Sequence, residues 1–252
     1  MMPLVLILTL AAVSPSPRDA AGNQLEPLKP AAASAARLCA ADQHWCAEID
    51  QDAGALRVFA GPTGAAVASV EIEKGEGEVL AVWPQMARLA GPRAAVLIGV
   101  EHRYSATYSG GEGAATVLEL IEVSPDRSRP PRSVLTQPLF GSIMTRACFS
   151  KQDFADRKGA CQDVLSFEAT LTLAPETASG PPRFQLTTQA KALPPKAPDG
   201  GDPTPIGRLK KQDLVPKPDA TCSYRRLLTF DPASKAYQPD RPLPDCDEYT
   251  AL

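Results

Sequence analysis

The sequence predicts a mainly β protein, an antiparallel sandwich or partly open barrel of about nine or ten short strands with one short helix. Three observations predict this fold class. Apolar and polar residues alternate in several short runs, many of the 26 prolines fall between those runs, and the six cysteines form three close pairs. With 252 residues, of which 44% are hydrophobic, the chain can bury one sizeable core.

The first 37 residues are expected to precede the folded domain. Residues 1–14, the expected signal peptide, consist almost wholly of an apolar run that the Ser-Pro-Ser-Pro sequence of residues 14–17 ends. The run has the length of the apolar region of a secretory signal peptide and is too short to span a bilayer. An apolar first strand or short helix is the alternative. Residues 15–37 are rich in proline and alanine and are expected to form a linker, which leaves 38–252 as a single β-rich domain.

The first half of this domain is expected to consist of strands joined by glycine-containing turns. Residues 56–60 and 68–73 flank a Gly-Pro-Thr-Gly turn and are expected to pair as a hairpin. Four more runs are typical of strands: 79–83, 94–107, 116–123 and 134–140. The longest of them, 94–107, reaches the next strand through a glycine-rich turn.

The second half contains the most regular alternation. Residues 165–173 and 184–190 each place apolar side chains on one face and polar side chains on the other, so we expect a hairpin with one buried face. A long loop rich in proline and glycine, 193–205, follows and is expected to be either functional or disordered. Residues 224–230 form the last expected strand.

The cysteines predict three local disulfides. An even number of cysteines in an exported chain favours disulfides, although six cysteines allow 15 pairings. Their close spacing in pairs favours Cys39–Cys46, Cys148–Cys161 and Cys222–Cys246. The spacing does not match a zinc site, so no metal is expected. The expected helix lies inside the middle pair, where Ser150 and Asp153 resemble a capping box and Gly159 is placed to end it.

Composition and motifs exclude or disfavour several classes of function. A formal charge of −3 argues against a nucleic-acid partner. The chain lacks the nucleophile elbow, the metalloprotease motif, the phosphate-binding loop and the dinucleotide-binding fingerprint. We therefore assign no catalytic residue and expect no cofactor.

The candidate ligand-binding residues lie near the end of the longest expected strand. Two-residue periodicity places His102, Tyr104 and Tyr108 on one face, where they would form the wall of a cleft. The alternative is a strand that leaves the core, with His102 hydrogen-bonded to a neighbour. A hydrolase with His102 as its base would require His102 to be accessible to solvent and within hydrogen-bond distance of a carboxylate and of a serine or threonine. Ser109 is one candidate nucleophile, because it is close to His102 in the sequence.

The loop closed by Cys39 and Cys46 contains a second candidate. It includes His44 and Trp45, and a small constrained loop of this kind can present a tryptophan to a ligand. The alternative is that Trp45 fills the core beneath the disulfide.

Together these observations predict an exported protein, periplasmic or secreted, that binds an envelope protein or a glycan without catalysis. The mature chain is expected to have no transmembrane segment and no nucleic-acid partner. Two other functions are kept as alternatives, namely a hydrolase that uses His102 and an inhibitor or assembly factor that presents the loop 193–205.

Overall fold

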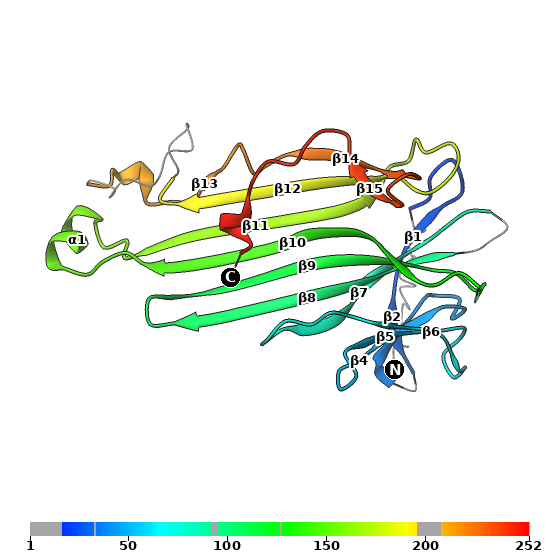
Figure 1. Cartoon of the computed structure of the whole chain (residues 1–252). Helices are drawn as coiled ribbons and strands as arrows, with labels where there is room; N and C mark the ends of the chain where they lie inside the picture. The colour runs from blue at the N-terminus through cyan, green and yellow to red at the C-terminus, as the bar shows by residue number, and fades with distance from the viewer. Residues whose placement is uncertain (1–16, 33, 92–94, 127, 196–207, 252) are drawn as a thin grey trace, which may run out of the picture.

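A computed structural model of the chain describes residues 17–32, 34–91, 95–126, 128–195 and 208–251. Within these residues the protein is mainly β, with two antiparallel sheets that are open and do not close into a barrel (Figure 1). The predicted fold class is confirmed. The described residues form fifteen strands, more than predicted, because short strands near both ends of the chain have little alternation.

The larger sheet contains ten strands and forms most of the molecule (Figure 1). Nine of them follow one another across the sheet in the order β1 (Gln24–Pro27), β7 (Val79–Arg88), β8 (Val96–Tyr108), β9 (Gly111–Val123), β10 (Arg132–Arg146), β11 (Gln162–Leu173), β12 (Phe184–Leu193), β14 (Arg225–Asp231) and β15 (Ala236–Pro239). The tenth, β13 (Lys217–Pro218), pairs with the end of β12. The predicted hairpin of 165–173 with 184–190 is the β11–β12 pair, in which Ala169 lies opposite Thr188.

The smaller sheet contains the five strands β2 (Lys29–Ala31), β3 (Ser34–Cys39), β4 (Cys46–Asp50), β5 (Ala55–Phe59) and β6 (Ala66–Glu71), paired in chain order. It packs near one end of the larger sheet (Figure 1). The predicted first hairpin corresponds to β5 and β6, with Leu56 opposite Val70.

The two faces of the larger sheet are buried in two different cores. On one face, Ile98 and Val100 of β8 pack against Leu56 and Val58 of β5, so this core joins the two sheets. On the other face, Leu97 belongs to a core made almost wholly by the larger sheet, which curves so that β10 contacts β15 and β1 contacts β11. The first half of β8 is therefore apolar on both faces, as expected for a strand covered on both sides.

All six cysteines form the three predicted disulfides, Cys39–Cys46, Cys148–Cys161 and Cys222–Cys246. The middle disulfide encloses α1 (Lys151–Asp156), which begins with the predicted capping box of Ser150 and Asp153. Two short 3-10 helices, η1 (Lys211–Asp213) and η2 (Asp247–Tyr249), complete the described elements.

The expectation that residues 15–37 form a linker is wrong for the residues described from 17 onward. This segment contains β1, β2 and most of β3, and Leu25 and Leu28 are buried in the two cores. Its prolines are compatible with strands because β1 and β2 each lie at the edge of a sheet, where a missing N–H breaks no ladder. The segment is therefore part of the folded domain.

Two expectations fall on residues outside those described. The proposed signal peptide, 1–14, lies wholly outside them, and most of the loop 193–205 does as well. Within the described residues, no helix has the length and hydropathy needed to cross a membrane.

Candidate functional site

A cleft of ≈ 630 Å³ lies between the two sheets. β6 and the loop that follows it form one wall, and β8, β9 and the start of β10 form the other. Its volume is in the range of small-molecule sites. The wall formed by β6 and its loop carries three carboxylates, those of Glu71, Glu73 and Glu78. The wall formed by β8 and β9 carries His102, Tyr104 and Glu119.

The register of three strands brings a histidine and two carboxylates together. His102 of β8 lies opposite Leu80 of β7 and Val117 of β9. Glu78 precedes Leu80 by two residues, and Glu119 follows Val117 by two. Because side chains two residues apart share a face of a strand, both carboxylates lie diagonally beside His102.

His102 is held between these carboxylates by both of its ring nitrogens. Nδ1 contacts Oε1 of Glu78, and Nε2 lies 3.2 Å from Oε2 of Glu119. The other oxygen of Glu78 accepts the backbone N–H of Gly75 at 2.6 Å. The side chains of His102 and Glu78 are 12% and 1% exposed, whereas that of Glu119 is 21% exposed. Glu119 is thus the carboxylate that is more accessible to a ligand.

The electrostatics of this cluster favour a charged histidine. The hydrogen bond to Glu119 is the largest influence on His102, and together with Glu78 it raises the pKa of the imidazole although burial acts in the opposite direction. In return, the hydrogen bond from His102 lowers the pKa of Glu119, and a bond to Ser133 acts in the same direction. The raised pKa of His102 and the lowered pKa of Glu119 both favour the ion pair of an imidazolium with a carboxylate.

This arrangement restricts what His102 can do chemically. A general base needs a ring nitrogen that is free to accept a proton from a nucleophile. Both nitrogens of His102 are occupied by carboxylates, and the nearby Ser133 interacts with Glu119. Ser109 lies in the turn after β8, about 20 Å along the strand from His102. The pairing of Ser109 with His102 considered from the sequence is therefore wrong.

The structure brings together only part of the predicted set of ligand-binding residues. His102 and Tyr104 both line the cleft, and burial together with the Glu78 carboxylate raises the pKa of Tyr104. Tyr108 is 49% exposed at the far end of β8, beside the turn to β9. Trp45 is 8% exposed and packs in the core between the two sheets, so it does not line the cleft.

Sequence reasoning missed both carboxylates. Glu119 could have been found, because the turn between 94–107 and 116–123 sets a hairpin register that places it diagonally beside His102. Glu78 had no comparable signal. It lies just before β7, and its approach to His102 depends on how β7 pairs with β8 after a bulge between Val82 and Met86.

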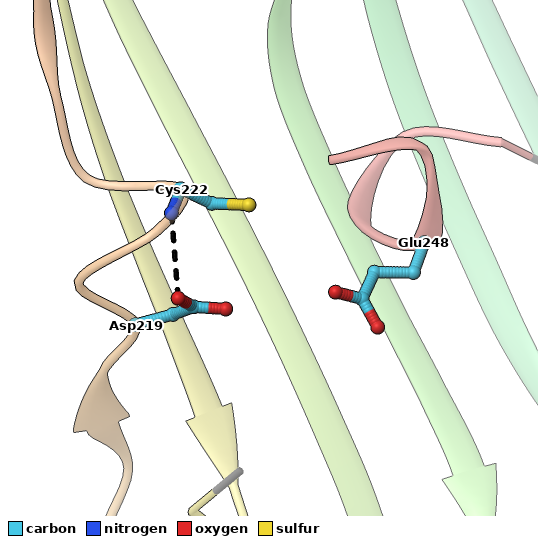
Figure 2. Close-up of side chains that lie close together, drawn as sticks. All are labelled: Asp219, Cys222 and Glu248. Atoms are coloured by element: carbon cyan, nitrogen blue, oxygen red, sulfur yellow. Dashed lines mark hydrogen bonds between the residues drawn. The ribbon is translucent and has the colours of Figure 1, made fainter. Parts of the chain in front are cut away.

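A second cluster of potential ligand atoms is structural. Asp219, Cys222 and Glu248 lie together near the C-terminus (Figure 2). The sulfur of Cys222 is bonded to Cys246, so it cannot act as a thiolate ligand. One oxygen of Asp219 accepts the N–H groups of Thr221 and Cys222, and the other accepts the Tyr249 hydroxyl at 2.8 Å. Asp219 therefore ties η2 to the segment before β14.

A comparison with known proteins finds no matching family model, no significantly similar curated protein and no significantly similar solved structure. The cleft and its residues are thus the basis for assigning a function.

Proposed function

We propose that this chain is a non-catalytic binding domain of the cell envelope whose cleft binds a cationic group, a primary amine or a guanidinium. The observation that carries this proposal is the position of His102, with both ring nitrogens bonded to Glu78 and Glu119. A histidine held in this way fixes the orientation of the two carboxylates and is not available as a base.

The charge in the cleft favours a cation. Four carboxylates line it, those of Glu71, Glu73, Glu78 and Glu119. The positive groups that line it are His102 and Arg132, and the Arg132 guanidinium is hydrogen-bonded at 2.6 Å to Glu122. The carboxylates therefore outnumber the cations even when the imidazole is charged. A concave site of one sign raises the local concentration of ligands of the opposite sign.

The exposed polar and aromatic groups suit the recognition of an ammonium or guanidinium. Glu119 is partly accessible, and because each carboxylate oxygen can accept more than one hydrogen bond, it can accept one from a ligand in addition to its bonds with His102 and Ser133. Tyr104 offers a ring to the same cleft, and an aromatic face attracts a cation within about 6 Å. A ligand group of this kind occurs in lysine and arginine side chains of an envelope protein and in amino sugars of a glycan.

Calorimetric titration with four small probes tests this proposal. N-acetyl-lysine amide, N-acetyl-arginine amide and glucosamine carry the cation, whereas N-acetyl-citrulline amide is a neutral analogue of the arginine probe. We expect heats of binding from cationic probes only, and the stronger class identifies the source as peptide or glycan. Binding of citrulline with the same affinity, or no binding of any cation, would overturn the proposal.

A matched pair of variants locates the binding. Glu119→Gln removes a carboxylate that lines the cleft, whereas Glu112→Gln removes an exposed carboxylate from the same strand outside it. The loss of one charged hydrogen bond is expected to lower affinity about tenfold in the first variant. Glu112→Gln is expected to bind as the wild type does.

A further inference from the structure

We propose that the end of the larger sheet farthest from the smaller sheet docks on an anionic lipid surface. This end consists of residues 146–163, which include α1, together with 208–213, and is called the helical tip below. In Figure 1 α1 projects from the molecule at the end opposite to the smaller sheet. The cleft between the sheets and the helical tip are separate features, so the two proposals can fail independently.

The helical tip carries the two most exposed large hydrophobic side chains of the described residues. Phe149 is 74% exposed and Phe154 is 59% exposed. Tyr108 and Val215, which are 49% and 52% exposed, lie on neighbouring segments at the same end of the sheet. Large apolar groups that gather at one end of a protein mark a contact with a partner or a membrane.

The phenylalanines are held outward by a rigid support. The Cys148–Cys161 disulfide closes the base of the loop, and Ser150 caps α1. Arg157, the C-cap residue of α1, is buried, donates to the carbonyl of Ala160 and pairs with Asp163. Because the loop is fixed in this way, its two phenyl rings are presented to solvent by the fold itself.

The charges around the phenyl rings favour an anionic partner. The carboxylates of the tip are engaged within it: Asp153 caps α1, Asp156 pairs with Arg208, Asp163 pairs with Arg157, and Asp213 accepts the N–H of Lys210. Four lysines of the tip are exposed, namely Lys151, Lys158, Lys210 and Lys211. The helical tip therefore combines two exposed phenyl rings with more basic than acidic side chains.

The shape of the tip suits a lipid surface. It projects from the end of the larger sheet (Figure 1), carries two exposed phenyl rings and four exposed lysines, and its described helix α1 is too short to offer a long apolar face that would fill a groove. Aromatic rings can enter the interfacial region of a bilayer while lysines contact anionic headgroups. Two rings and four lysines predict reversible binding that weakens as salt is added.

Sedimentation with lipid vesicles tests the proposal. The wild type is mixed with vesicles of phosphatidylcholine alone and with vesicles in which about one third of the lipid is phosphatidylglycerol. Three double variants are compared with it, namely F149S/F154S, K151Q/K158Q and the control K29Q/K235Q, whose lysines are exposed elsewhere. Circular dichroism establishes that each variant is folded.

We expect the wild type to sediment with the anionic vesicles only. Loss of both phenylalanines is expected to lower the partition coefficient at least tenfold, and loss of two tip lysines about tenfold. K29Q/K235Q is expected to be unchanged. If the wild type sediments with neither kind of vesicle, the proposal is overturned, and a protein is favoured as the partner of the tip. A folded F149S/F154S variant that binds as well as the wild type would overturn it too.

Fluorescence of Phe149→Trp provides a direct second readout. The native tryptophans, Trp45 and Trp83, are 8% and 5% exposed, so vesicles should change their emission little. If the tip enters the interface, the emission of the new tryptophan shifts to shorter wavelength with anionic vesicles. An unchanged spectrum at a lipid concentration that sediments the protein would show that another surface makes the contact.

Discussion

Replacing His102 with leucine tests whether the cluster in the cleft is charged and structurally coupled. Leucine has a similar volume but offers no donor to either carboxylate. Glu78, whose side chain is 1% exposed, would lose the His102 donor and keep the Gly75 N–H at 2.6 Å and the hydrogen bond with Tyr104. Loss of a hydrogen bond to a buried charge costs about 1.5–3 kcal/mol, and loss of the more exposed bond to Glu119 adds about 0–1 kcal/mol. We therefore expect a loss of about 2–4 kcal/mol in the free energy of unfolding.

The effect of pH on this loss is set by the direction of the pKa shift. Because the pKa of His102 is raised in the folded state, its charge stabilises the fold fully below the ordinary value of 6.5. That contribution is lost as the pH rises through the folded-state pKa. The difference between wild type and His102→Leu is therefore expected to be larger near pH 6 than near pH 9, where the neutral imidazole can donate only once.

Urea unfolding, monitored by the fluorescence of the two buried tryptophans, measures this difference with the disulfides intact. The slope of the free energy against urea should be the same in wild type and variant, so that a shift in midpoint reports stability alone. His44→Leu is the control, because His44 is exposed in the loop between Cys39 and Cys46. A His102→Leu variant as stable as wild type, or a loss that does not change with pH, would refute the charged cluster.

Three further predictions concern other parts of the structure. Because His102 lowers the pKa of Glu119, the stability that Glu119 contributes is fully present above the ordinary pKa of 4.5 and is lost as the pH falls through the lowered pKa. In Glu119→Gln, the free energy of unfolding should therefore fall less steeply with decreasing pH than in the wild type. In Gly141→Ala, the new Cβ would lie 1.9 Å from the Tyr249 carbonyl oxygen. This variant should lose about 1–3 kcal/mol in thermal unfolding, whereas Gly110→Ala, with ordinary contacts, should not. Replacing Cys148 and Cys161 with serine should cost about 3 kcal/mol and speed trypsin cleavage within residues 151–158; an unchanged cleavage rate would contradict the supporting role of the disulfide.

Local patterns in the sequence predicted the parts of the fold that depend on neighbouring residues. The alternation in 165–173 and 184–190 specifies a hairpin because the two runs are separated by one turn and bury one common face. The cysteine pairs were predictable for the same reason, since each closes a short local loop. Ser150 and Asp153 predicted the start of α1, because a capping box needs only four consecutive residues.

Features that depend on distant residues were not predictable in this way. The segment 24–31 resembles a linker in composition, but Glu26 pairs with Arg88 and Leu25 enters a core made by strands far along the chain. Its strands form because partners exist elsewhere in the fold. The same limit applies to the cleft: periodicity placed His102 and Tyr104 on one face, but Glu78 reaches them only through the pairing of β7 with β8.

We propose above that the cleft between the two sheets binds a cation. Amide chemical-shift mapping by NMR with N-acetyl-arginine amide, and with its citrulline analogue as the neutral control, tests it most directly. If the cleft binds a cation, shifts are expected at 71–78, 102–104 and 117–121 with the arginine probe and none with the citrulline probe. Shifts that fall outside the cleft, or that are equal for both probes, would contradict it.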